Sequence, residues 1–301
     1  MSPSVPRPVA SDHGGPDLAV NPGVWMTGWQ PALAESLVER IARIGYRRIV
    51  AVLRDPWTYD TSGIRSLVGS HGLRLMTNTN QNAAEDISSD DAEVRDRGLA
   101  RLRRGVQLSA ELESDRLTGI LYGVLGKAAG PASRAVFDRT AKILGDLAEE
   151  AAESGVGLLV EVVNRYETSL LNTAGQAMDF VAASGSDRLG VHLDVFHMNI
   201  EEDDMVAAVA EALPRLGYLE LEQNHRGELS RGHIPLAEFV TGAIETGYRG
   251  RFGLEAFTVS ALAPDHAAGL AVWRDVLDRD TRVAEDAHAL LAAAYASVDP
   301  G

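Results

Sequence analysis

The stretch from Gly157 to Asp194, GLLVEVVNRYETSLLNTAGQAMDFVAASGSDRLGVHLD, carries the repeating pattern from which the fold can be inferred. It begins with an apolar run at Gly157–Val163, continues through an amphipathic segment at Thr173–Ala183, and returns to an apolar run at Leu189–Asp194. Short apolar runs bounded by turns predict buried strands, and the longer amphipathic segment predicts a helix. The stretch therefore predicts one strand–helix–strand unit of a parallel sheet.

The same alternation runs along the chain from Leu18 onward. Several of the expected helices end in a turn with a glycine, at Gly45, Gly155 and Gly247, as helix C-termini commonly do. The remaining strands are expected at Leu18–Val24, Arg48–Leu53, Leu73–Thr77, Leu117–Val124, Gly217–Glu222 and Arg251–Glu255. The remaining helices are expected at Pro31–Ile44, Ser62–Ser70, Asp90–Glu111, Pro131–Ser154, Glu202–Leu213, Ile234–Thr246, Pro264–Leu277 and Thr281–Ser297.

Eight strands, each followed by a helix, predict a single (β/α)8 TIM barrel over residues 17–301, with extra helices at its C-terminal end. An open doubly wound sheet is the runner-up, but it normally has a glycine-rich phosphate loop after its first strand. The segment Gly23–Trp29 lacks that spacing. Residues 1–16 hold prolines, serines and glycines but no apolar core, so they are expected to form a disordered tail.

Composition narrows the classes of partner. The 301 residues carry a formal net charge of -15, which disfavours nucleic acid and anionic membranes as partners. No apolar run approaches the ~20 residues of a membrane span. The chain has no cysteine, which excludes disulfides, thiolate metal sites and a cysteine nucleophile, and which suits a cytoplasmic location.

Four consecutive expected strands each carry a carboxylate at or near the C-terminal end. Glu161, Asp194, Glu220 and Glu255 are separated by 33, 26 and 35 residues, about one strand–helix unit each. In a barrel these ends meet on the face that holds active sites. Buried carboxylates that converge repel one another unless a cation lies between them, and an oxygen-rich set suits Mg²⁺ or Mn²⁺.

Several segments resemble a known family. The sequence reads EVVNRYE at Glu161–Glu167, HLDVFHMNIEE at His192–Glu202, NHRG at Asn224–Gly227, GYRG at Gly247–Gly250 and GLEAF at Gly253–Phe257. These motifs resemble the sugar phosphate isomerase/epimerase family, whose members have a xylose-isomerase-like barrel, and most of all its tagatose/psicose 3-epimerases. The likeness extends from about Leu18 to Trp273 and is most specific in the second half.

The resemblance implies a role for each matching position. Glu161 and Glu255 would be metal ligands that also form the catalytic proton-transfer pair, and Asp194 would be a metal ligand. Glu167, His197 and Arg226 would bind the hydroxyls and carbonyl oxygen of a sugar. The implied cofactor is a divalent metal, Mn²⁺ or Mg²⁺, and the implied activity moves a proton next to a carbonyl through an enediolate. Relatives often form homo-oligomers.

The sequence departs from the family at one ligand. The family usually has a histidine six residues before the loop arginine, and counting back from Arg226 leads to Glu220. Three outcomes stay open: Glu220 ligates Mg²⁺ or Mn²⁺, His192 or His225 supplies an imidazole instead, or the metal is lost. We favour the first, because the other matching positions are intact.

Three functions remain possible at this point. The first is a ketose 3-epimerase or related sugar isomerase. The second is a lyase of the same superfamily that acts on an oxidised sugar, as in C-glycoside deglycosidation or inosose dehydration, because its first step is the same enolisation. The third is a metal-free, degenerate barrel that binds a sugar or a partner subunit. An endonuclease on a related barrel would need more histidines and a less acidic surface.

Overall fold

The computed structural model describes residues 16–26, 29–277 and 282–298. The tail expected at residues 1–16 therefore lies outside the described residues, except for its last position. No helix in these three ranges combines the length and the apolarity that a bilayer crossing requires.

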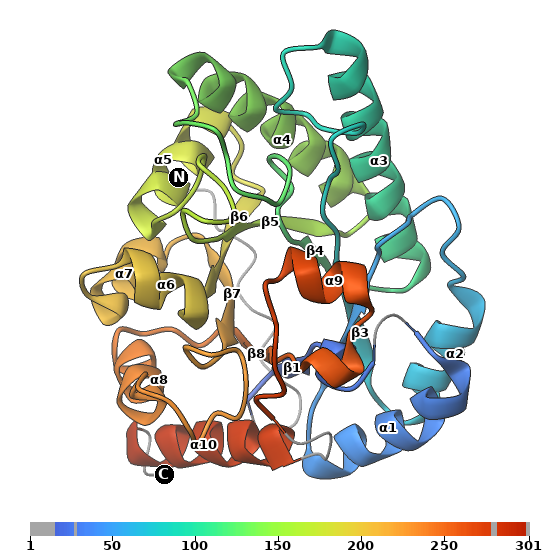
Figure 1. The fold of residues 1–301 in the computed structure, drawn as a ribbon, viewed down its shortest axis with the longest axis vertical. Helices are drawn as coiled ribbons and strands as arrows, with labels where there is room; N and C mark the ends of the chain where they lie inside the picture. The colour runs from blue at the N-terminus through green and yellow to red at the C-terminus, as the bar shows by residue number, and fades with distance from the viewer. Residues whose placement is uncertain (1–15, 27–28, 278–281, 299–301) are drawn as a thin grey trace.

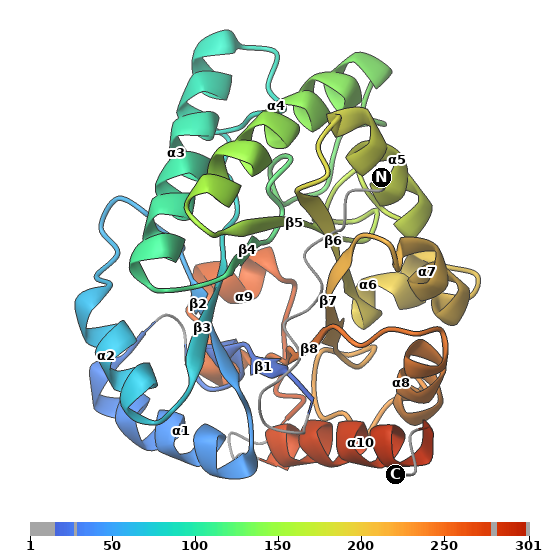
Figure 2. The ribbon, with the colours of Figure 1, turned by 180° about the vertical axis from the view of Figure 1, so that it is seen from behind.

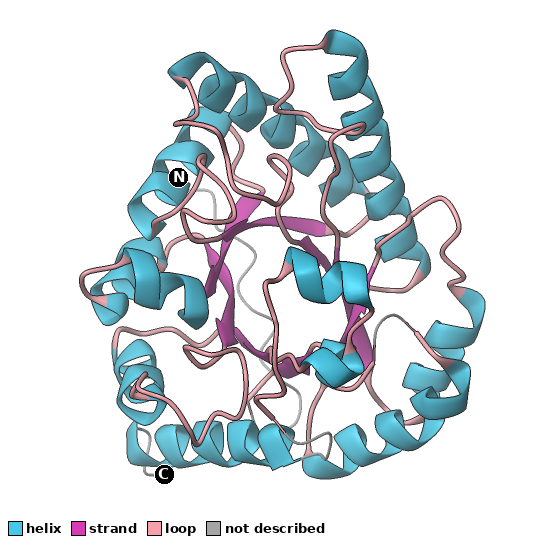
Figure 3. Ribbon diagram, viewed as in Figure 1, coloured by secondary structure: helices cyan, strands magenta, loops and turns pink. Residues whose placement is uncertain are grey.

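Eight parallel strands form a closed barrel in chain order, and β1 pairs with β8 to close it. This confirms the predicted fold class and excludes the open sheet. Figure 3 shows the ring of strands surrounded by helices. The strands are β1 (Leu18–Val20), β2 (Arg48–Val52), β3 (Arg74–Asn78), β4 (Arg116–Thr118), β5 (Gly157–Val162), β6 (Leu189–Asp194), β7 (Leu216–Leu221) and β8 (Arg251–Leu254).

The helices form the outer layer, and α10 completes it by packing beside α8 and α1 (Figure 1). Gly45, Gly155 and Gly247 have positive φ angles of 111°, 75° and 101° at the turns where the sequence places them, which glycine adopts without steric cost. The helices are α1 (Pro31–Ile44), α2 (Ser62–Ser70), α3 (Ala92–Glu111), α4 (Arg134–Glu153), α5 (Ala174–Ser184), α6 (Val195–Glu201), α7 (Met205–Ala212), α8 (Leu236–Glu245), α9 (Pro264–Gly269) and α10 (Arg282–Val298), with short 3-10 turns η1 (Pro22–Val24) and η2 (Val259–Ala261).

Most bounds differ by one to three residues, and four expected elements depart further from the structure. The first strand ends at Val20 because Pro22–Val24 form the turn η1, and the fourth ends at Thr118 because Gly119 turns the backbone to a φ of 124°. The helix expected at Glu202–Leu213 is α7, which starts only at Met205, and a helix that was not expected, α6, precedes it directly after Asp194, whose side chain caps it. The helix expected at Pro264–Leu277 ends at Gly269.

The barrel interior has three levels. At the N-terminal end of the strands, Arg48 and Arg251 bind the carboxylates of Asp17 and Asp115. An apolar middle level consists of Ala19, Val50, Met76, Leu159 and Tyr218. The C-terminal end carries the acidic side chains of β5 to β8. The apolar middle level thus separates the charged side chains at the two ends of the barrel, and it packs directly below the acidic level.

Gly253 of β8 makes room for the ring of Tyr218. A Cβ at position 253 would lie 1.8 Å from the Tyr218 hydroxyl oxygen, far inside van der Waals contact, and the ring is fully buried. We expect Gly253→Ala to lower the free energy of unfolding by about 1–3 kcal/mol through this overpacking. Gly63→Ala is the control, because a Cβ there meets nothing within 4 Å. Equal denaturation midpoints for both variants would contradict the account.

Candidate active site

A cavity opens at the C-terminal end of the strands. Its wall includes Glu161, Glu167, His197, Arg226 and Glu255, which are five of the seven site residues expected from the sequence. Helix α9 lies over this end in Figure 1 and behind the barrel in the reverse view of Figure 2, and it contributes His266 to the lining, with Leu270 directly after the helix. The cavity is therefore bounded by strand ends below and by a C-terminal helix above.

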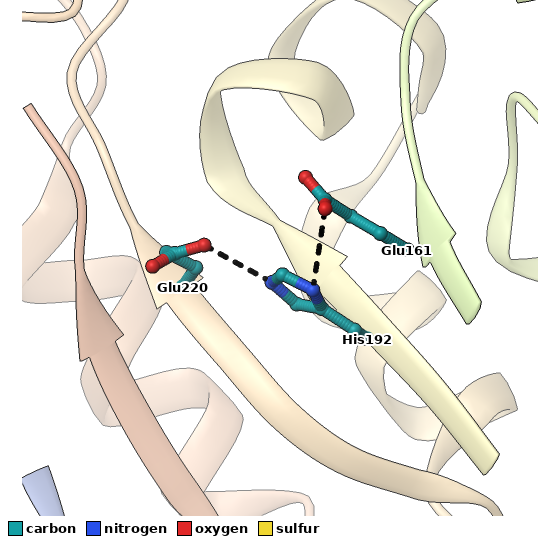
Figure 4. A group of neighbouring side chains, drawn as sticks. All are labelled: Glu161, His192 and Glu220. Carbon is teal, nitrogen blue, oxygen red and sulfur yellow. Dashed lines mark ion pairs between the residues drawn. The ribbon is translucent and has the colours of Figure 1, made fainter. Parts of the chain in front are cut away.

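One group of three side chains comes from three neighbouring strands. Glu161 of β5, His192 of β6 and Glu220 of β7 each offer a ligand atom, and these atoms lie within 4.8 Å of one another. Figure 4 shows the imidazole between the two carboxylates. The Nε2 atom of His192 lies 3.2 Å from Glu220 Oε2, and its Nδ1 lies 3.8 Å from Glu161 Oε2. Nδ1 also makes a 2.9 Å hydrogen bond with the Thr118 hydroxyl.

A second group consists of carboxylates alone. Asp194, Glu222 and Glu255 each offer an oxygen within 4.8 Å of the other two. Asp194 Oδ1 accepts hydrogen bonds from the amides of Phe196 and His197, but its Oδ2 is buried without a partner. Glu222 Oε2 is likewise buried without a partner. Two buried carboxylate oxygens without hydrogen-bond partners destabilise the folded state unless a cation binds them.

Arg226 joins three of the carboxylates. Its guanidinium donates to Glu222 Oε1 at 3.0 Å, to Glu255 Oε2 at 2.9 Å and to Glu167 Oε1 at 3.5 Å. The guanidinium carbon lies 4.4 Å from the centre of the Phe196 ring and 4.9 Å from that of Phe257, so both rings hold it by cation–π contact. This places a fixed positive charge at the cavity wall.

His197 is held in one tautomer. Its Nδ1 accepts hydrogen bonds from the side chain of Asn164 at 2.7 Å and from the Asn164 amide at 3.2 Å. Burial and the nearby Arg226 lower its pKa well below the usual range, so the ring is neutral and Nε2 carries the proton. His197 lines the cavity, where this N–H can donate to a ligand oxygen.

The carboxylates have a higher proton affinity than in water. Burial, followed by repulsion from Glu220, raises the pKa of Glu255 to about 7. Burial also raises the pKa of Glu220 to about 7 and those of Glu161, Asp194 and Glu222 well above the usual range. Burial lowers the pKa of His192 to about 3, so this ring is neutral. Such shifts are typical of a site that performs proton transfer or binds a cation.

The residues fit a divalent cation. The donor set is five carboxylates and one neutral imidazole, and three of these side chains carry a buried atom without a partner: Asp194 Oδ2, Glu222 Oε2 and His192 Nε2. Oxygen-rich ligation favours hard cations such as Mg²⁺ and Mn²⁺. A cation would stabilise the ionised carboxylates and lower their pKa values.

The structure places the expected site residues at this end of the barrel, but it divides the four expected metal ligands between the two groups, with Glu161 and Glu220 in one and Asp194 and Glu255 in the other. It also adds residues that sequence reasoning missed. Glu222 was not expected, although strand alternation places it on the same face as Tyr218 and Glu220. Asn21 was also missed, and its side chain donates to Glu255 Oε1 at 2.6 Å. His225, one of the open candidates for an imidazole ligand, belongs to neither group of candidate metal-binding residues in the described part of the chain.

Comparisons with known proteins agree with this architecture. A family model described as "Xylose isomerase-like TIM barrel" matches residues 38–277. The chain is 34% identical to an L-ribulose 3-epimerase of Methylomonas sp., over 89% of this chain and 92% of that protein. It is 32% identical to a ketose 3-epimerase of Arthrobacter globiformis, over 84% of this chain and 88% of that protein. The structure of a Methylomonas sp. D-allulose 3-epimerase in complex with D-allulose superposes with a TM-score of 0.85. The two sequences are 32% identical, and the match covers 94% of this chain and 96% of that chain.

The raised carboxylate pKa values make stability depend on pH. Between the usual carboxyl pKa of about 4.3 and the folded value of about 7, the folded state binds more protons than the unfolded state, so stability falls as pH rises. We expect the metal-free protein to lose free energy of unfolding from pH 5 to pH 8, measured by urea titration. Glu255→Gln should flatten this fall, and the exposed Glu39→Gln should not; parallel curves for both would contradict it.

Proposed function

The chain belongs to the xylose isomerase-like TIM barrel family, and on that premise we propose that it is a divalent-metal-dependent ketose 3-epimerase. It is an enzyme of the isomerase and epimerase class, since relatives that match along most of its length are 3-epimerases. The observation that carries the proposal is the convergence of buried carboxylates from four adjacent strands, with oxygens that lack a partner, beside a cavity.

The proposed substrate is a ketose, and the reaction inverts the carbon next to its carbonyl. The C3–H bond breaks, its electron pair moves into an enediolate, and a proton returns to C3 from the opposite face. A divalent cation, when bound, supplies positive charge that stabilises the enediolate oxygens. Glu161, Asp194 and Glu255 are the proposed ligands from β5, β6 and β8, and either Glu220 or Glu222 supplies the ligand from β7.

Glu161 and Glu255 are the proposed acid/base pair. Both line the cavity, and they come from β5 and β8, so one can lie on each face of a bound sugar. Their raised pKa values favour catalysis near neutral pH, because one carboxylate must accept a proton while the other donates one. Deprotonation on one face and protonation on the other give inversion without any other titrating group.

Three further residues are proposed to bind the substrate. Arg226 places fixed positive charge where the carbonyl oxygen becomes negative, and the two flanking rings limit its movement. His197 donates from Nε2, and Glu167, which also lines the cavity, accepts from a sugar hydroxyl. These contacts orient the carbon that reacts between the two carboxylates.

The relatives favour the epimerase over the other two functions. A lyase on an oxidised sugar would use the same enolisation, and a metal-free binding barrel would leave the partnerless oxygens uncompensated. A cytoplasmic location and association into a homo-oligomer stay predictions.

The test is proton NMR of Mn²⁺-loaded protein in D₂O with a panel of ketoses and 3-oxo-glycosides. The epimerase gives deuterium at C3 together with a new epimer. Glu161→Gln and Glu255→Gln should each lower kcat about 10²- to 10⁴-fold, because each removes one half of the proton transfer. The exposed Glu39→Gln is the matched control.

Two results would count against the proposal. Loss of an aglycone from the oxidised glycosides, without exchange on any ketose, would establish the lyase. Failure of the wild-type protein to bind Mn²⁺ would favour the binding barrel.

A further inference from the structure

Two carboxylates lie at the C-terminal end of β7, one in each of the two groups of side chains. Glu220 lies at the position where the family usually has a histidine, and Glu222 follows two residues later, directly after the strand ends at Leu221. Both side chains are buried, with exposed fractions of 4% and 0%. They differ in what already binds their oxygens, and this difference decides which of them is free to hold a cation.

Glu220 is engaged by side chains of the barrel interior. The Tyr218 hydroxyl donates to Glu220 Oε1 at 2.9 Å, and the imidazole of His192 lies 3.2 Å from Glu220 Oε2. Tyr218 belongs to the apolar middle level, and His192 is itself bound to Thr118. Glu220 Oε1 is thus held by a hydrogen bond, whereas Oε2 lies beside a neutral imidazole nitrogen that has no hydrogen-bond partner.

Glu222 is engaged at one oxygen only. Its Oε1 accepts from Arg226 Nε at 3.0 Å, and its Oε2 is buried without a partner. Glu222 belongs to the same group as Asp194, whose Oδ2 is also without a partner, and as Glu255. Two partnerless oxygens from different strands in one group indicate a common ligand that is positively charged.

We propose that Glu222, just after β7, and not Glu220, joins the proposed ligands Glu161, Asp194 and Glu255 around a divalent cation. In this arrangement the ion does not bind Glu220, which packs below it with Tyr218 and His192. This inference rests on the proposed function, since it assumes that the site binds metal.

The proposal explains how the chain can dispense with the histidine of its family. Moving the ligand two residues along the strand keeps it on the interior face and brings it beside Arg226. Arg226 bridges Glu222 and Glu255 and so offsets part of the charge that a carboxylate adds in place of an imidazole. The change from imidazole to carboxylate also predicts a preference for hard cations.

The test is Mn²⁺ binding measured by electron paramagnetic resonance, in which the signal of free Mn²⁺ disappears on binding. Glu222→Gln keeps the side-chain shape but removes the charge, and it should raise the Kd of Mn²⁺ at least about 100-fold. Glu220→Gln is the matched variant on the same strand, and its Kd should stay within about tenfold of the wild-type value. The opposite ranking would overturn the inference.

Two further outcomes separate the inference from the proposed function. If the wild-type protein binds no Mn²⁺, the proposed function itself fails; if it binds Mn²⁺ and Glu222→Gln binds equally tightly, only the inference fails. Should Glu222→Gln not fold, a loss of binding in Glu220→Gln alone overturns the proposal. Electron spin echo of the loaded wild type should show no directly coordinated ¹⁴N, and such a coupling would place the ion at His192 instead.

Discussion

The structure depends on one electrostatic constraint, the compensation of five buried carboxylates at the C-terminal end of the barrel. Each would cost free energy if it were ionised alone in an apolar interior. Arg226 offsets part of this charge through Glu222 and Glu255, and burial raises the proton affinity of the rest. A divalent cation would complete the compensation, and the positive charge that it would bring is also what enolisation of a ketose requires.

The rest of the barrel keeps this acidic level in place. Tyr218 in the apolar level fixes Glu220, and Gly253 on the neighbouring strand leaves the space that the tyrosine ring needs. Asp194 caps α6 with one oxygen and keeps the other free, so helix formation and the site share one side chain. The positions of the site side chains therefore depend on contacts with residues only two or three positions away in the sequence.

Much of the fold could be predicted from the sequence, because apolar runs indicate strands and glycine-containing turns indicate the ends of helices. The bounds that failed depend on single backbone events, such as the turn at Gly119 or the cap at Asp194, which the apolar pattern does not record. The four carboxylates were found from their spacing. The choice between Glu220 and Glu222 was not accessible, because it depends on which carboxylate oxygens the side chains of Tyr218 and Arg226 bind, and the order of the residues does not fix these contacts.

The central claim is that the buried carboxylates form a metal centre, and anomalous X-ray scattering from crystals soaked in Mn²⁺ tests it most directly. The account predicts an anomalous peak within coordination distance of oxygens from Asp194, Glu222 and Glu255. A peak beside His192 would support a metal centre but place it in the other group of side chains. No peak at either group, from crystals that hold Mn²⁺ in the solvent, would contradict the account.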